Sequence, residues 1–148
     1  MKTMLAALVA LLLSVRALPV QAAMVTRDVR WTLDGTHFRG VLIHDDASHA
    51  LRPGLLMVPN WYGVDDDAIA KARNIAGDRY VILLADLYGE GVHPRTTAAA
   101  QAAVAPLYGD RVRMRARMLA ALRELRTQEG RAPIDPACIA AIGFCFGG

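Results

Sequence analysis

Alternating apolar and polar residues predict two strands early in the chain. Val25–Leu33 and Thr36–His44 have strand-like compositions and are separated by Asp34-Gly35, a dipeptide that favours two-residue hairpin turns. The next stretch, Asp45–Pro53, is polar and contains a proline, so we expect a connecting loop there. The pattern therefore predicts that an antiparallel hairpin opens the domain.

Three continuous apolar runs predict buried strands, in contrast to the two hairpin strands. They are Gly54–Val58, Tyr80–Ala85 and Cys138–Phe144. Short runs of aliphatic residues without alternation are typical of parallel strands that are covered on both faces. We therefore expect three buried parallel strands.

Helical patterns separate these runs. Asp66–Ala76 starts with acidic residues, which favour a helix N-terminus, and Gly77 follows its last turn. Thr96–Ala105 is rich in alanine, and Gly109–Glu129 carries apolar residues at the spacing of one helix face. The order of strand, helix, strand, helix and strand predicts one α/β domain with a mostly parallel sheet behind the antiparallel hairpin.

The N-terminal residues predict export. The apolar run Met4–Leu13 follows a lysine, and small residues that end at Ala22 resemble a signal-peptidase site. A membrane span is the competing interpretation, but Arg16 and Pro19 interrupt the run before the roughly 20 apolar residues that a span needs. We expect a cleaved signal peptide at 1–22 and a mature protein in the periplasm or secreted, with no membrane attachment after cleavage.

The charged residues do not indicate a nucleic-acid partner. The formal net charge is +3, and the arginines concentrate on one predicted helix at the spacing of its solvated faces: Arg111, Arg113, Arg115, Arg117, Arg123 and Arg126. A nucleic-acid interface would interleave such a stripe with aromatic residues or carry a reading motif, and neither is present. We therefore expect no nucleic-acid partner.

Both cysteines are expected to be free thiols. Cys138 and Cys145 lie at opposite ends of one predicted strand. A strand rises about 3.3 Å per residue, which separates the two Cα atoms by more than the ~7 Å that a disulfide permits.

The second cysteine stands in a motif that carries chemistry. Gly143-Phe144-Cys145-Phe146-Gly147 directly follows a strand, which is G-x-C-x-G, the cysteine form of the nucleophile elbow. The turn from strand to helix strains the nucleophile's backbone, and glycines two residues away avoid a clash. The start of the following helix would favour the thiolate, and the Phe146 N–H could donate to a developing oxyanion. A buried packing cysteine and a redox-sensing thiol are the alternatives.

Three segments together resemble the dienelactone hydrolase family. They are Asn60-Trp61-Tyr62-Gly63, Asp86-Leu87-Tyr88-Gly89 and Gly143-Phe144-Cys145-Phe146-Gly147-Gly148. The resemblance implies an α/β-hydrolase fold and a Cys-His-Asp triad that hydrolyses small ester or lactone bonds through an acyl-thioester enzyme. It also implies that the Trp61 N–H is the second oxyanion donor, although Trp61 could instead only pack over the sheet.

The chain departs from the family pattern at one position beside the nucleophile. Asn60 stands where the resemblance implies a glutamate, and an amide cannot accept the proton, although it can hydrogen-bond the thiol or order a water. Arg95 could pair with a substrate carboxylate, or it could be solvated like most surface arginines. His37, His44, His49 and His93 are expected to be surface or turn residues.

The resemblance implies an N-terminal part of a hydrolase that stops at its elbow. In α/β-hydrolases the triad acid and histidine follow the nucleophile, and three residues follow Cys145 here, so we expect this fragment alone to be inactive. A non-catalytic exported binding protein on the same fold is the alternative. We expect no cofactor and no metal, because Asp65, Asp66 and Asp67 are consecutive at a helix start and lack a liganding spacing.

Overall fold

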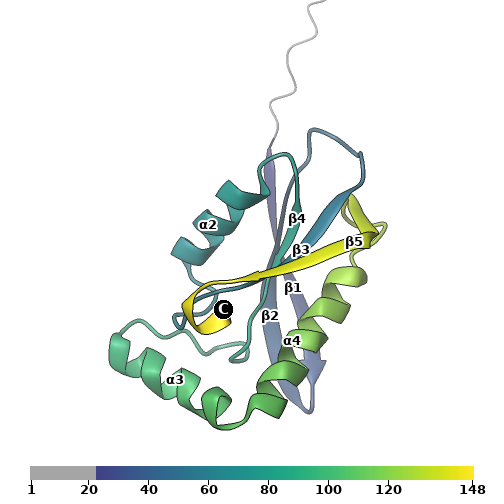
Figure 1. Ribbon diagram of the computed structural model, residues 1–148. Coiled ribbons are helices and arrows are strands. Elements are labelled where there is room, and N and C mark those ends of the chain that lie inside the picture. The colour runs from purple at the N-terminus through teal and green to yellow at the C-terminus, as the bar shows by residue number, and fades with distance from the viewer. Residues whose placement is uncertain (1–22) are drawn as a thin grey trace, which may run out of the picture.

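The computed structural model describes residues 23–148 (Figure 1). The predicted signal peptide lies outside these described residues. Five strands form one open sheet in the order β1-β2-β4-β3-β5. Strands β3, β4 and β5 run parallel to one another, whereas β2 is antiparallel to both β1 and β4. The predicted parallel sheet with an N-terminal antiparallel hairpin is therefore confirmed.

The hairpin consists of β1 (Met24–Leu33) and β2 (Thr36–Asp45). Leu33 pairs with Thr36, and the two residues between them, Asp34 and Gly35, have φ values of 49° and 74°. Positive φ at both central positions gives the turn whose twist matches that of the flanking strands. The local sequence signal is thus sufficient to set this register.

The parallel part of the sheet consists of β3 (Arg52–Val58), β4 (Val81–Leu84) and β5 (Ile134–Gly143). Strand β3 lies between β4 and β5, so the carboxyl ends of all three reach the same edge of the sheet. Both β3 and β4 are almost wholly buried, as their continuous apolar runs predict. This shared edge brings together the segments that follow each strand.

Helices cover both faces of the sheet (Figure 1). On one face, α2 (Asp66–Ala76) packs its buried Ala68, Ala72 and Ala76 against β2 and β4. On the other face, α4 (Arg111–Arg126) packs against β1 and β3, and α3 (Thr97–Gly109) contacts α4. Two apolar clusters result, one on each side of the sheet.

Two predicted helix boundaries are wrong. The alanine-rich helix continues through Pro106 to Gly109, and the next helix begins at Arg111 and ends at Arg126. Asp110 separates the two because its carboxylate accepts a hydrogen bond from the Arg113 N–H at 2.9 Å and caps the second helix. Arg117 also differs from the predicted solvated face, since it is partly buried and donates to the carbonyls of Leu87 and Tyr88.

The third predicted strand, β5, starts earlier than predicted and is mostly exposed within residues 23–148. Strand β5 begins at Ile134, which is its one buried residue, and the other positions are partly or fully exposed. Within residues 23–148 it forms the edge of the sheet, where Pro136 is tolerated beside the register shift opposite Pro53 and Gly54. His44 was expected at the surface, but it is buried because β2 lies inside the sheet.

Candidate active site

The turn after β5 has the backbone of a nucleophile elbow. Cys145 has φ 57°, and among residues 23–148 the only other non-glycine residue with positive φ is Asp34 in the hairpin turn. Such a conformation costs about 1–3 kcal/mol for a residue with a side chain and persists where its surroundings impose it. The Phe144 N–H donates to the Val58 carbonyl at 3.2 Å, and the Gly147 N–H donates to the Phe144 carbonyl at 3.0 Å. These bonds fix the chain on both sides of Cys145.

The two elbow glycines lie where no side chain fits. A Cβ on Gly143 would overlap the carbonyl group of Gly147. A Cβ on Gly147 would lie 2.5 Å from the carbonyl oxygen of Val58 in β3. Both obstacles are backbone atoms, which cannot rotate away as a side chain could. Glycine is therefore the residue that fits at both positions of the motif.

The thiol faces solvent. Cys145 and Cys138 are both exposed and both free, as expected. The chain continues as a 3₁₀ turn over Cys145–Gly147.

The segment after β3 forms a tight turn built on Asn60. Its side-chain oxygen accepts from the Tyr62 N–H at 2.9 Å, and its backbone carbonyl accepts from the Gly63 N–H at 3.0 Å. Gly63 has φ 77°, which this turn requires. The Asn60 oxygen is thus engaged in the turn, while its NH₂ group has no hydrogen-bond partner among the described residues and is available to donate.

Two backbone amides in the segments after β3 and β5 remain available to donate. Neither the Trp61 N–H nor the Phe146 N–H donates a hydrogen bond within residues 23–148. Phe146 directly follows Cys145 and is buried, and Trp61 is partly buried against the same apolar cluster. The two predicted oxyanion donors therefore come from the segments after β5 and β3, which end at one sheet edge.

Tyr88 links these two segments, and the sequence reasoning did not single it out. Its hydroxyl donates to the Trp61 carbonyl at 2.8 Å, and its ring stacks on that of Phe146 at 5.8 Å between centroids. Burial raises the pKa of Tyr88 to about 12, with smaller contributions from Tyr108, Cys145 and Asp86. The sequence feature that could have pointed to Tyr88 is its position in the Asp86-Leu87-Tyr88-Gly89 segment, which directly follows β4 at the same sheet edge.

The segment that carries Tyr88 is held by a buried carboxylate. Asp86 accepts from the N–H groups of Tyr88 at 2.8 Å and Gly89 at 3.0 Å with one oxygen, and from the Arg39 N–H at 3.1 Å with the other. Arg117 donates to the carbonyls of Leu87 and Tyr88 at 2.6 and 3.2 Å. Burial and neighbouring Arg113 lower the pKa of Arg117, while Asp86 acts in the opposite direction.

Arg95 lies in a different hollow from the thiol. A groove of about 720 Å³ is lined by Arg95, His93, Arg39, Asp28 and Tyr62, and neither Cys145 nor Phe146 is among its lining residues. Only Tyr62 connects it to the turn after β3. The structure therefore does not bring Arg95 into contact with the elbow.

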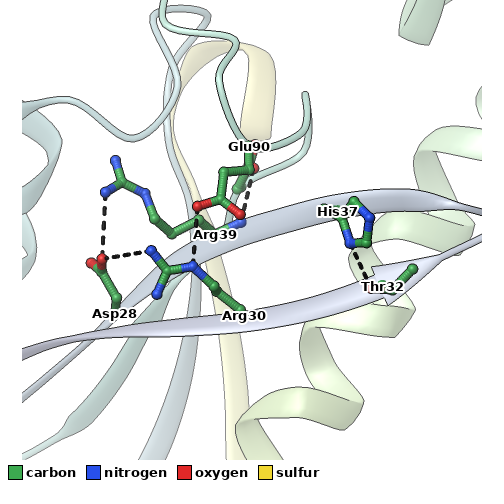
Figure 2. Close-up of polar contacts among 7 residues, drawn as sticks. Asp28, Arg30, Thr32, His37, Arg39 and Glu90 are labelled. Carbon is green, nitrogen blue, oxygen red and sulfur yellow. Dashed lines mark hydrogen bonds and ion pairs between the residues drawn. The ribbon is translucent and has the colours of Figure 1, made fainter.

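Charged side chains of the hairpin pair with one another and with Glu90 (Figure 2). Arg30 lies between Glu90 and Asp28, at 3.0 and 3.5 Å, and Arg39 reaches the same Asp28 carboxylate at 3.4 Å. His37 bonds the Thr32 hydroxyl on the hairpin and is exposed, as are His49 and His93, as expected.

The described residues contain no cluster of three or more histidine, cysteine or acidic side chains that could hold a metal ion. Asp65 instead caps α2, because its carboxylate accepts from the Ala68 N–H at 2.7 Å. No helix between residues 23 and 148 has the length and apolar character needed to cross a membrane.

Comparison with known proteins gives a consistent result. The model of the dienelactone hydrolase family matches residues 38–148. A dienelactone hydrolase-like promiscuous phosphotriesterase from metagenomic libraries is 34% identical, with a TM-score of 0.75, over 84% of this chain and 51% of its own. The protein m3DLH is 38% identical, with a TM-score of 0.76, over the same shares of the two chains. No match is found among curated proteins.

A more distant structure shares the fold alone. A bacterial heroin esterase is 17% identical, with a TM-score of 0.52, over 95% of this chain and 40% of its own. The chain spans about half the length of the first two structures it matches. The expected partial α/β-hydrolase fold is thereby confirmed.

Proposed function

Since this chain belongs to the dienelactone hydrolase family, we propose that the complete gene product hydrolyses small ester or lactone bonds with Cys145 as its nucleophile. The observation that carries the proposal is the backbone of Cys145. An exposed thiol at φ 57°, between two glycines whose Cβ positions are blocked by backbone, follows a parallel strand of an α/β sheet. This is the geometry that presents a nucleophile at the end of a strand.

The reaction has two steps. The Cys145 thiolate attacks the ester carbonyl carbon, and the carbonyl electron pair moves to the oxygen. The amides of Trp61 and Phe146 donate to this oxyanion, and its collapse expels the alkoxide. The alkoxide takes up the proton that the Cys145 thiol released on forming the thiolate, and leaves as the alcohol. Water then attacks the thioester carbonyl, releases the acid and returns the thiol. For a lactone, the alcohol and the acid stay in one molecule.

Two further groups belong to this proposal. The Asn60 NH₂ donates to the thiol or to an ordered water, because its oxygen is already occupied by the Tyr62 N–H. Arg95 binds a carboxylate on the distal part of a substrate that extends from the elbow into the groove. The triad acid and histidine come from residues after Gly148, and the protein acts after export to the periplasm or secretion.

The test is hydrolysis of p-nitrophenyl acetate by the complete gene product, read through any codons after Gly148. We expect Cys145→Ala to lower kcat/KM at least 100-fold, because the acyl-enzyme cannot form. Cys138→Ala is the matched control, since it removes a second exposed free thiol from the same strand and its activity should equal that of the parent.

Equal activity in Cys145→Ala and the parent would overturn the proposal. An inactive parent whose sequence after Gly148 lacks histidine would also overturn it and would favour the exported binding protein.

A further inference from the structure

Tyr88 lies between the two segments that supply the proposed oxyanion donors. Its hydroxyl donates to the Trp61 carbonyl at 2.8 Å, and its ring stacks on Phe146 with 15° between the planes. The same ring closes the turn after β3, where a Cβ on Gly63 would lie 3.2 Å from it. With 8% of its surface exposed, Tyr88 is enclosed by the groups it touches.

The hydrogen bond from Tyr88 completes the restraint of the turn after β3. The peptide unit before Trp61 is held through its Asn60 carbonyl, which accepts from the Gly63 N–H, so the Trp61 N–H points the other way. The next peptide unit is held at both ends. Its N–H, on Tyr62, donates to the Asn60 side chain, and its carbonyl, on Trp61, accepts from Tyr88. The two successive peptide groups on either side of the Trp61 Cα are thus fixed.

The stacked ring of Tyr88 also restrains the second proposed donor, the Phe146 N–H. Phe146 is buried, with Tyr88 on one face of its ring and the edge of Tyr108 at 5.6 Å between centroids. A fixed side chain limits rotation of the backbone that carries it, so the Phe146 N–H keeps its direction. Tyr88 itself is anchored by the three hydrogen bonds to Asp86 and by Arg117.

We propose that Tyr88 is the positioning residue of the oxyanion site: it holds the Trp61 and Phe146 amides in one geometry, and it acts on the acylation of Cys145 and not on the reactivity of the thiol. The inference rests on the proposed function of Cys145. Acylation by an ester builds charge on oxygen and needs both donors, whereas alkylation by iodoacetamide displaces iodide and needs the thiol alone.

The experiment compares Tyr88→Phe with the parent in the complete gene product. The substitution keeps the ring on Phe146 and removes the bond to the Trp61 carbonyl. Loss of a whole oxyanion donor lowers kcat about 10²–10³-fold, so a donor that remains but is less well positioned should lower it about tenfold, with little change in KM. The rate of alkylation by iodoacetamide should be unchanged.

Tyr108→Phe is the matched control. Tyr108 also packs on Phe146, but its hydroxyl makes no hydrogen bond within residues 23–148, so both rates should match those of the parent. Thermal unfolding of each variant shows whether the fold is kept, and in a destabilised variant the alkylation rate still reports directly on the elbow.

The outcomes separate the two proposals. A tenfold lower kcat with parental alkylation supports the positioning role. Equal losses of acylation and alkylation, a change in KM alone, or parental kinetics in Tyr88→Phe would overturn that role while leaving Cys145 as the nucleophile. Parental acylation in Cys145→Ala would overturn the proposed function itself, and with it the role of Tyr88.

Discussion

At the residue scale, the site depends on backbone atoms more than on side chains. The unfavourable φ of Cys145 is retained because the carbonyl of Val58 accepts from Phe144 and leaves no space for a Cβ at Gly147. One carbonyl of β3 thus restrains the chain on both sides of the thiol. The strain turns the side chain of Cys145 toward solvent, where a substrate can reach it.

The buried hydroxyl of Tyr88 leads to a prediction about pH. Burial raises its pKa from 10.0 to about 12 in the folded protein. Its contribution to stability is complete below pH 10 and is lost as pH rises from about 10 to about 12, because over that range the unfolded chain releases the proton and the folded protein keeps it. Absorbance at 295 nm should therefore show that Tyr88 ionises above pH 10.

The measurement is a difference titration between the parent and Tyr88→Phe. The tyrosinate signal that the variant lacks should have its midpoint well above pH 11. A midpoint near 10 would contradict the raised pKa.

At the element scale, helix α2 is specified by its first residues. Asp65 accepts from the Ala68 N–H at 2.7 Å, and Asp66 and Asp67 add negative charge to the first turn. We predict that Asp65→Ala lowers the free energy of unfolding by about 1 kcal/mol, measured by urea denaturation. Asp66→Asn, which removes only a charge near the helix N-terminus, should have a smaller effect of about 0.3–1 kcal/mol. Equal decreases in the free energy of unfolding for the two variants would show that negative charge, and not the capping hydrogen bond, stabilises the N-terminus of α2.

Local signals predicted the elements well, and tertiary contacts account for the errors. The hairpin turn and the ends of α2 depend on neighbouring residues, so the sequence was sufficient for both. The start of β5 was missed because Asp135-Pro136 is a turn signal that an edge strand nevertheless accommodates. Its exposure applies to residues 23–148, in which β5 is the last strand of the sheet.

At the scale of the whole molecule, the candidate site combines Cys145, which the sequence singled out, with Tyr88, for which the sequence indicated a segment and no role. Cys145 is recognised from glycines two residues on either side, so five consecutive letters suffice. Tyr88 acts through Trp61, which is 27 residues away, and through Phe146, which is farther. That the segments after β3, β4 and β5 meet follows from strand order, and no local pattern encodes strand order.

Strand order also explains the position of Arg95. It belongs to the long connection after β4, next to the antiparallel hairpin, and therefore lies beside Arg39 and Asp28 in the groove. A substrate would have to extend from the elbow past Tyr62 to contact both Cys145 and Arg95. Under the proposed function, the carboxylate that Arg95 binds is therefore distant from the scissile bond.

Export is the remaining prediction for the whole molecule. It concerns Ala23, the first described residue, which would become the N-terminus after cleavage of the signal peptide. The Ala23 N–H donates to the Asp46 carboxylate at 2.9 Å, and the Asp46 N–H donates back to the Ala23 carbonyl at 3.1 Å. Cleavage after Ala22 would place a positively charged α-amino group beside this carboxylate, which stabilises the new terminus at the start of β1.

We predict that protein purified from the periplasm or medium has an intact mass that begins at Ala23. Replacing the small residue before the cleavage site, in Ala22→Leu, should leave the precursor unprocessed, because signal peptidases require small residues there. Asp46→Asn is the control, since it alters only the partner of the new terminus and should be cleaved normally. A mass that still includes Met1, found only in the cytoplasmic fraction, would show that the apolar N-terminal run is not a signal peptide.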